Sequence, residues 1–125
     1  MPAQWKFLQT IAESEIDTIL QALPTDLSTE ARRVPVTFEA RPGKALRADG
    51  IEADTLGLFV GGSFADFESG AALMPPQVFL FLQNIWELAD GNEEAFREEL
   101  RTTFLHELGH YLGLDESDLE ERGLD

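Results

Sequence analysis

The sequence predicts an α+β domain in which helices pack against one small sheet. Apolar residues recur at helical spacing near both ends of the chain, and three short apolar segments with strand-like patterns lie between them. These segments are too close in sequence for every pair to be parallel, because parallel neighbours need a crossover connection. We therefore expect a mixed sheet of three to four strands, packed against an N-terminal and a C-terminal helix, in a single domain spanning residues 1–125.

Two long amphipathic helices are predicted from the periodicity of the apolar side chains. Residues 3–22 end before Pro24 and place a stripe of apolar side chains at helical spacing. Residues 92–112 repeat apolar side chains every three or four residues, and Asn92 is available as the N-cap. The first stripe comprises Leu8, Ile11, Ile16, Ile19, Leu20 and Leu23, and the second comprises Phe96, Leu100, Phe104, Leu108 and Tyr111.

Three strands are predicted between these helices. Residues 34–40 alternate apolar and other side chains, and residues 56–62 form a short apolar segment whose glycines indicate a bend or a close backbone approach. Residues 77–85 form a strongly apolar third strand. The connections are expected to be loops that shape the cleft, because residues 41–55 are rich in glycine, proline and charge and residues 63–76 close with two prolines.

The composition excludes several functional classes. The formal net charge is −15, from 24 acidic and 9 basic residues, and such a surface repels nucleic acid and anionic membranes. The N-terminal segment has neither the apolar run of a membrane span nor the pattern of a signal peptide, so we expect a cytoplasmic protein. Because the chain has no cysteine, only histidine nitrogen and carboxylate oxygen could hold a metal.

The segment HELGHYLGLDE at residues 106–116 predicts a zinc site on the second helix. His106 and His110 lie four residues apart, about 40° around the helix axis, so both imidazoles can reach one metal ion. Glu107 flanks the same face and could take a proton from a metal-bound water. In the alternative interpretation, His106 is a core histidine bonded to a backbone carbonyl and Glu107 belongs to the acidic surface.

A third ligand is expected just after this helix. Gly113 can adopt the left-handed conformation that ends a helix and turns the chain back. Glu116 follows at the spacing of the extended zinc motif, and two histidines with one carboxylate leave a fourth position open, as a catalytic site requires. Asp115 is the adjacent candidate, and Asp118 is near. Alternatively, these acids form only a solvated turn, because the segment is dense in charge.

The chain resembles the minimal zincin (mini-zincin) metallopeptidase-like family of small bacterial proteins. The resemblance covers the N-terminal helix ending at LP, the segments VPVTFEA, GLFVG and VFLF, and the terminal HELGHYLGL helix. The extended motif matches at His106, Glu107, His110 and Gly113. Its third position, usually aspartate or sometimes serine, is Glu116 here. The resemblance implies a compact zincin-like fold in which a peptide lies along an edge strand, by position Val78–Leu82, beside the active-site helix.

These observations predict a zinc-dependent metallopeptidase in which His106, His110 and Glu116 hold zinc. Glu107 would be the general base, and the partner would be a peptide or protein substrate. No tyrosine, histidine or methionine follows Glu116, so we expect weak or narrow activity, and Tyr111 is expected to be a core or rim aromatic. Two alternatives stay open: a catalytically idle zincin-fold module that binds metal or a peptide partner, and a zinc hydrolase of other bonds.

Overall fold

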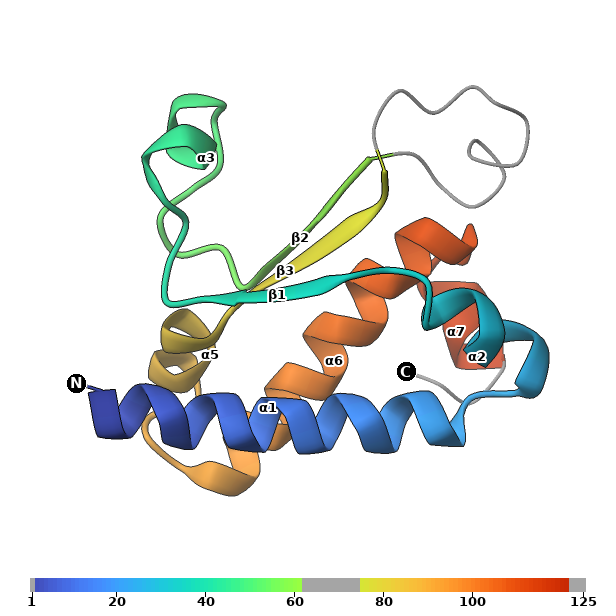
Figure 1. The fold of residues 1–125 in the computed structure, drawn as a ribbon, viewed down its shortest axis with the longest axis horizontal. Helices are drawn as coiled ribbons and strands as arrows, with labels where there is room; N and C mark the ends of the chain where they lie inside the picture. Colours follow the sequence, from blue (N-terminus) through green and yellow to red (C-terminus); the bar gives the residue numbers. More distant parts are fainter. Residues whose placement is uncertain (1, 62–74, 122–125) are drawn as a thin grey trace.

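The computed structural model describes residues 2–61 and 75–121, apart from the side chains of residues 2 and 116. The two long helices lie on one side of a three-stranded sheet, which confirms the predicted α+β class (Figure 1). Most of the predicted loop 63–76 lies outside the described residues. In chain order the elements are α1 (Pro2–Ala22), α2 (Thr25–Ala31), β1 (Val36–Glu39), α3 (Lys44–Ala48), β2 (Gly57–Val60), β3 (Gln77–Phe81), α5 (Leu82–Leu88), α6 (Glu93–Leu112) and α7 (Glu116–Glu121).

The sheet has β3 at its centre, in the order β1-β3-β2. β1 runs parallel to β3 and β2 runs antiparallel to it, so the predicted mixed sheet with an antiparallel pair is confirmed. The prediction that Val78–Leu82 is an edge strand is wrong. Val78 pairs with Val36 on one side and with Phe59 on the other, and Leu82 is already the first residue of α5. Within the described residues, the edge strands are β1 and β2.

The hydrophobic core lies between the sheet and the long helices α1 and α6, which pass beneath it in Figure 1. Val78 and Leu80 of the central strand are fully buried there, and Phe38 and Phe59 of the flanking strands pack against the same core. Burying each large apolar side chain contributes up to about 1.5–3 kcal/mol. The helices supply their predicted stripes, which include Leu8, Ile11, Ile16 and Ile19 from α1 and Phe96, Leu100, Phe104, Leu108 and Tyr111 from α6.

The helix α6 is fixed at both ends, as the sequence predicted. Asn92 caps its start, because the side-chain Oδ1 accepts a hydrogen bond from the backbone N–H of Ala95 at 2.8 Å. Glu93 and Glu94 in the first turn complement the helix dipole. Gly113 ends the helix in the left-handed conformation, with φ 73° and ψ 26°. The segment that carries the histidines is therefore part of a capped, core-packed helix.

The predicted third strand is wrong beyond Phe81, where the chain turns into α5. Ile85 reaches the core from this short helix, and Asn84 is also buried. The Asn84 side-chain amide donates hydrogen bonds to the carbonyls of Ala53 and Thr55, each at 2.8 Å. These bonds anchor the segment that leads into β2. The short helices α2 and α3 were not predicted either, and α3 lies within a segment predicted to be loop.

Candidate metal centre

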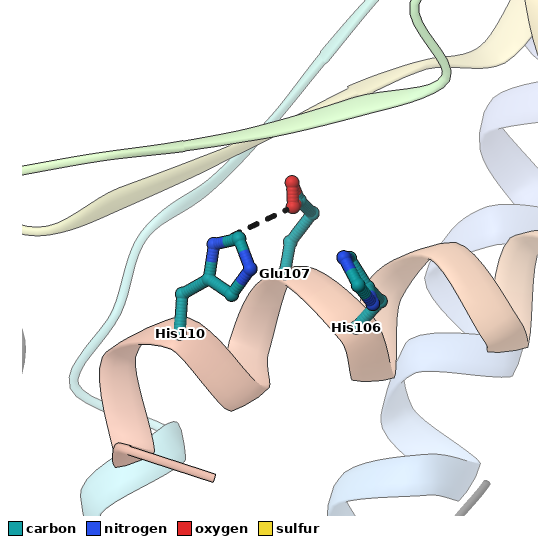
Figure 2. A group of neighbouring side chains, drawn as sticks. All are labelled: His106, Glu107 and His110. Atoms are coloured by element: carbon teal, nitrogen blue, oxygen red, sulfur yellow. Dashed lines mark ion pairs between the residues drawn. The ribbon is translucent and has the colours of Figure 1, made fainter. Parts of the chain in front are cut away.

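Three side chains gather on one face of α6: His106, Glu107 and His110 (Figure 2). One ligand atom from each lies within 4.8 Å of the other two, and the centroids of the two imidazole rings are 5.1 Å apart. Their spacing along the helix places them together, as the sequence predicted. Within the described residues, no other group of three or more potential metal-ligating side chains meets this distance.

The two histidines of this group are exposed. The side chain of His110 is 51% accessible. A core histidine, the alternative interpretation of His106, is therefore wrong. Exposed imidazoles on one helix face can be reached both by a metal ion and by a substrate, whereas core histidines could be reached by neither.

Glu107 is the buried member of the group, with 8% of the residue exposed. Its Oε2 atom accepts no hydrogen bond within the described structure, and it lies 4.0 Å from His110 Nδ1 along the dashed line of Figure 2. An unpartnered buried carboxylate oxygen costs about 1–3 kcal/mol or more, and a cation beside it offsets that cost. Imidazole nitrogen and carboxylate oxygen are donors that zinc accepts, so the residues fit a zinc ion.

The strand β2 lies against α6 and closes one side of this group. A Cβ atom on Gly57 would stand 2.6 Å from Thr103 Cγ2 and 3.2 Å from Glu107 Cγ, so the close approach requires glycine. Two residues later, the Phe59 ring packs edge-on against His110, with centroids 6.2 Å apart. β2 therefore restricts both Glu107 and His110. The glycines of this segment had indicated a close backbone approach, and the structure identifies α6 as the partner.

The turn after Gly113 brings the acidic C-terminal segment back alongside α6. Leu114 N donates a hydrogen bond to the carbonyl of Gly109 at 2.8 Å. A Cβ on Gly109 would lie 2.9 Å from Leu114 O, so this return path needs a residue without a side chain at that position. Leu119 is 6% exposed and holds α7 against α6. The predicted helix-ending turn is thus confirmed at Gly113.

The candidate third ligands lie in and beside a hollow between α6 and α7. Its lining includes His106, His110, Asp115 and Asp118. The two aspartates cap the start of α7 reciprocally: Asp118 N donates to Asp115 Oδ1 at 2.8 Å, and Asp115 N donates to Asp118 Oδ2 at 3.0 Å. Neither belongs to the group of candidate metal ligands on α6. Glu116 is the first residue of α7, but its side chain is outside the described structure, so its predicted role stays a prediction.

A comparison of sequences decides the family. A sequence model of the zincin-like metallopeptidase family matches residues 31–124, which is more than half of the chain and includes the whole motif. The chain belongs to the zincin-like metallopeptidase family. This membership confirms the resemblance seen in the motif and agrees with the His-Glu-His group on α6. No curated protein matches the chain in sequence.

The site of this zincin-like chain includes residues that the motif does not contain. Glu99 and Thr103 precede Glu107 by two turns and one turn of α6, and they line a second hollow with Gly57 and His106. Their spacing of four residues from one another and from Glu107 could have identified them from the sequence. Tyr111 is buried, 2% exposed, and its ring lies 6.2 Å from that of Phe59, which fits the expected core aromatic. Within the described residues, no helix is long and apolar enough to cross a membrane.

Proposed function

We propose that this zincin-like protein is a zinc-dependent metallopeptidase that hydrolyses peptide bonds. The observation that carries the proposal is Glu107 Oε2, a buried carboxylate oxygen unpartnered within the described structure, beside two exposed histidines on the same helix face. His106 and His110 would hold the metal. Bound zinc would polarise a peptide carbonyl and ease the deprotonation of water. Membership of a metallopeptidase family supports the same reaction.

Glu116 is the proposed third ligand. It stands at the spacing of the extended motif, three residues beyond the glycine that ends α6. Asp115 and Asp118 each already accept a backbone N–H at the start of α7, which supports a capping role for these two acids. Zinc content measured in Glu116→Gln and Asp115→Asn separates the candidates. We expect zinc to be lost in the first and kept in the second, and the reverse would assign the ligand to Asp115.

Glu107 is the proposed general base and then general acid. Its carboxylate takes a proton from the attacking water and delivers it to the nitrogen of the leaving amine, so the proton is conserved over the reaction. The side chain is well placed for this role, because Gly57 packs against its Cγ and His110 lies 4.0 Å from Oε2. A restricted side chain loses little freedom when it reaches the reactive geometry.

The edge of β2 is the proposed docking position for the substrate. The backbone N–H of Phe81 donates to Leu56 O at 2.9 Å, which sets the alternation of the antiparallel ladder between β2 and β3. In that alternation, the backbone N–H and C=O groups of Leu58 and Val60 face β3, whereas those of Gly57 and Phe59 point to the opposite edge. An extended peptide can add there as a further strand. Its backbone would then lie beside the face that carries Glu107 and His110.

Peptide cleavage tests the proposal directly. Zinc-loaded wild type, Glu107→Gln and the control Glu98→Gln are incubated with a broad peptide library, and new termini are identified by mass spectrometry. Glu98 is an exposed residue of α6 that lines neither hollow. We expect wild type and control to cleave the same peptides, and Glu107→Gln to keep zinc but lose about 100-fold or more in rate.

Two results would contradict the peptidase proposal. Equal cleavage by Glu107→Gln would remove the assigned role of this carboxylate. Zinc and peptide binding without cleavage in any variant would favour the catalytically idle binding module instead.

A further inference from the structure

His106 lies between two hollows, and each hollow is lined by carboxylates. One hollow, of about 360 Å³, lies toward α7 and is lined by Asp115 and Asp118. The other, of about 370 Å³, lies toward β2 and is lined by Glu99 and Glu107. His106 belongs to the lining of both. No lysine or arginine of the described structure lines either hollow, so no basic side chain in these two hollows neutralises the negative charge of the carboxylates.

Glu99 stands at the end of the β2-side hollow. It lies on the same row of α6 as Thr103 and Glu107, at successive spacings of four residues, so these side chains share one face. Glu99 makes no hydrogen bond or ion pair with any residue of the described structure, whereas Glu93 on the same helix pairs with Arg97 at 3.2 Å. The carboxylate of Glu99 is thus available to a cationic group that enters the hollow.

A second observation points to a ligand in this hollow. Glu107, which lines it, is more than nine-tenths buried, and its Oε2 is unpartnered within the described structure. The hollow therefore combines an acid at the reaction centre with a second acid further along the helix. Eight residues of α6 separate them, about 12 Å along the axis. Three residues of an extended peptide span about 10 Å, so a peptide on the edge of β2 brings a side chain near Glu99.

We propose that the hollow between β2 and α6 is a subsite for a lysine or arginine side chain of the substrate. The cationic residue lies two to three positions from the bond that is cleaved, and Glu99 is the specificity-determining residue. This inference rests on the proposed peptidase function and names its substrate class, a basic peptide. Charge complementarity supplies the preference, because a basic side chain meets a carboxylate with no counter-ion of its own in the hollow.

Binding measured without turnover tests the subsite independently of catalysis. Zinc-loaded Glu107→Gln protein is titrated into pairs of fluorescent peptides that differ only in lysine or norleucine at one position, scanned along the chain. At one position, lysine should bind about five- to tenfold more tightly than norleucine, and this preference should weaken as salt is raised. Adding Glu99→Gln should remove most of the preference, whereas adding Glu98→Gln should preserve it.

The same peptide pairs are then offered to the active zinc-loaded protein. A lysine preference in kcat/KM that Glu99→Gln abolishes and Glu98→Gln retains would support the subsite. Equal binding of lysine and norleucine at every position would overturn it, as would a preference that survives Glu99→Gln. The two proposals fail separately: charge-selective binding without cleavage contradicts the peptidase, and cleavage without charge preference contradicts the subsite. Circular dichroism and melting temperature confirm that both variants remain folded.

Discussion

Replacing Gly57 by alanine tests the packing of β2 against α6. The new Cβ would stand 2.6 Å from Thr103 Cγ2 and 3.2 Å from Glu107 Cγ, and real Cβ atoms almost never approach another heavy atom as closely as 2.6 Å. The strand or the helix must therefore move by several tenths of an ångström. Overpacking of this kind costs about 1–3 kcal/mol. The backbone at Gly57 is not left-handed, so alanine also restricts the unfolded chain, which returns about 0.4–1 kcal/mol.

The net loss expected for Gly57→Ala is about 1–2 kcal/mol, or about 4–8 °C in melting temperature. Thr103→Ser removes the methyl group that the new Cβ would meet, so the double variant should regain most of that loss. Gly43→Ala is the matched control, because nothing lies within 4 Å of its Cβ position. The melting temperatures of wild type, Gly57→Ala, the double variant and Gly43→Ala are measured by thermal unfolding with and without zinc. A Gly57→Ala protein as stable as wild type, or no rescue by Thr103→Ser, would refute the packing argument.

Three further perturbations test the two ends of α6 and the ion pair between Arg41 and Glu87. Asn92→Ala removes the hydrogen bond to Ala95 N and should lower the unfolding free energy by about 1 kcal/mol, measured by urea titration; an unchanged midpoint would contradict the cap. In Gly113→Ala the alanine would have to keep the left-handed φ of 73°, but its Cβ would meet no atom within 4 Å. The unfolding free energy from the same titration should therefore fall only by the backbone cost of about 1–2 kcal/mol. The hydrogen bond from Arg41 holds the pKa of Glu87 below its usual range, so this ion pair stabilises the fold at neutral pH and the stabilisation is lost as the pH falls through that lowered pKa. The difference in melting temperature between wild type and Glu87→Gln should therefore shrink on acidification. A difference that stays constant with pH would contradict the contribution of this ion pair.

Local patterns predicted the two long helices and the grouping of His106, Glu107 and His110 on one helix face. The apolar stripes of α1 and α6 are each about twenty residues long, and over that length helical periodicity is distinct from any strand pattern. His106, Glu107 and His110 follow from spacing within a single helix, so they require no knowledge of the rest of the fold. The end of α6 at Gly113 depends only on the backbone freedom of glycine and was predicted for the same reason.

The order of the strands could not be derived in this way, because pairing depends on residues far apart in sequence. Val78–Leu82 was assigned to an edge, yet β3 is central, with Val78, Leu80 and Phe81 all fully buried. Its apolar run contains no charged residue, whereas exposed edge strands commonly carry charges, and this signal favoured the central position. The helix α5 was missed because a short apolar segment fits a strand or a buried helix equally well. Only the structure places Glu99 beside β2.

Zinc stoichiometry tests the central claim most directly. Metal-free protein is reconstituted with zinc, freed of excess metal by gel filtration and analysed for bound metal in wild type, Glu107→Gln and the double variant His106→Ala/His110→Ala. One zinc ion per chain is expected in wild type and in Glu107→Gln, and none in the double variant. Wild-type protein that binds no zinc after reconstitution, or a double variant that keeps a full equivalent, would contradict the assignment of the metal centre to α6.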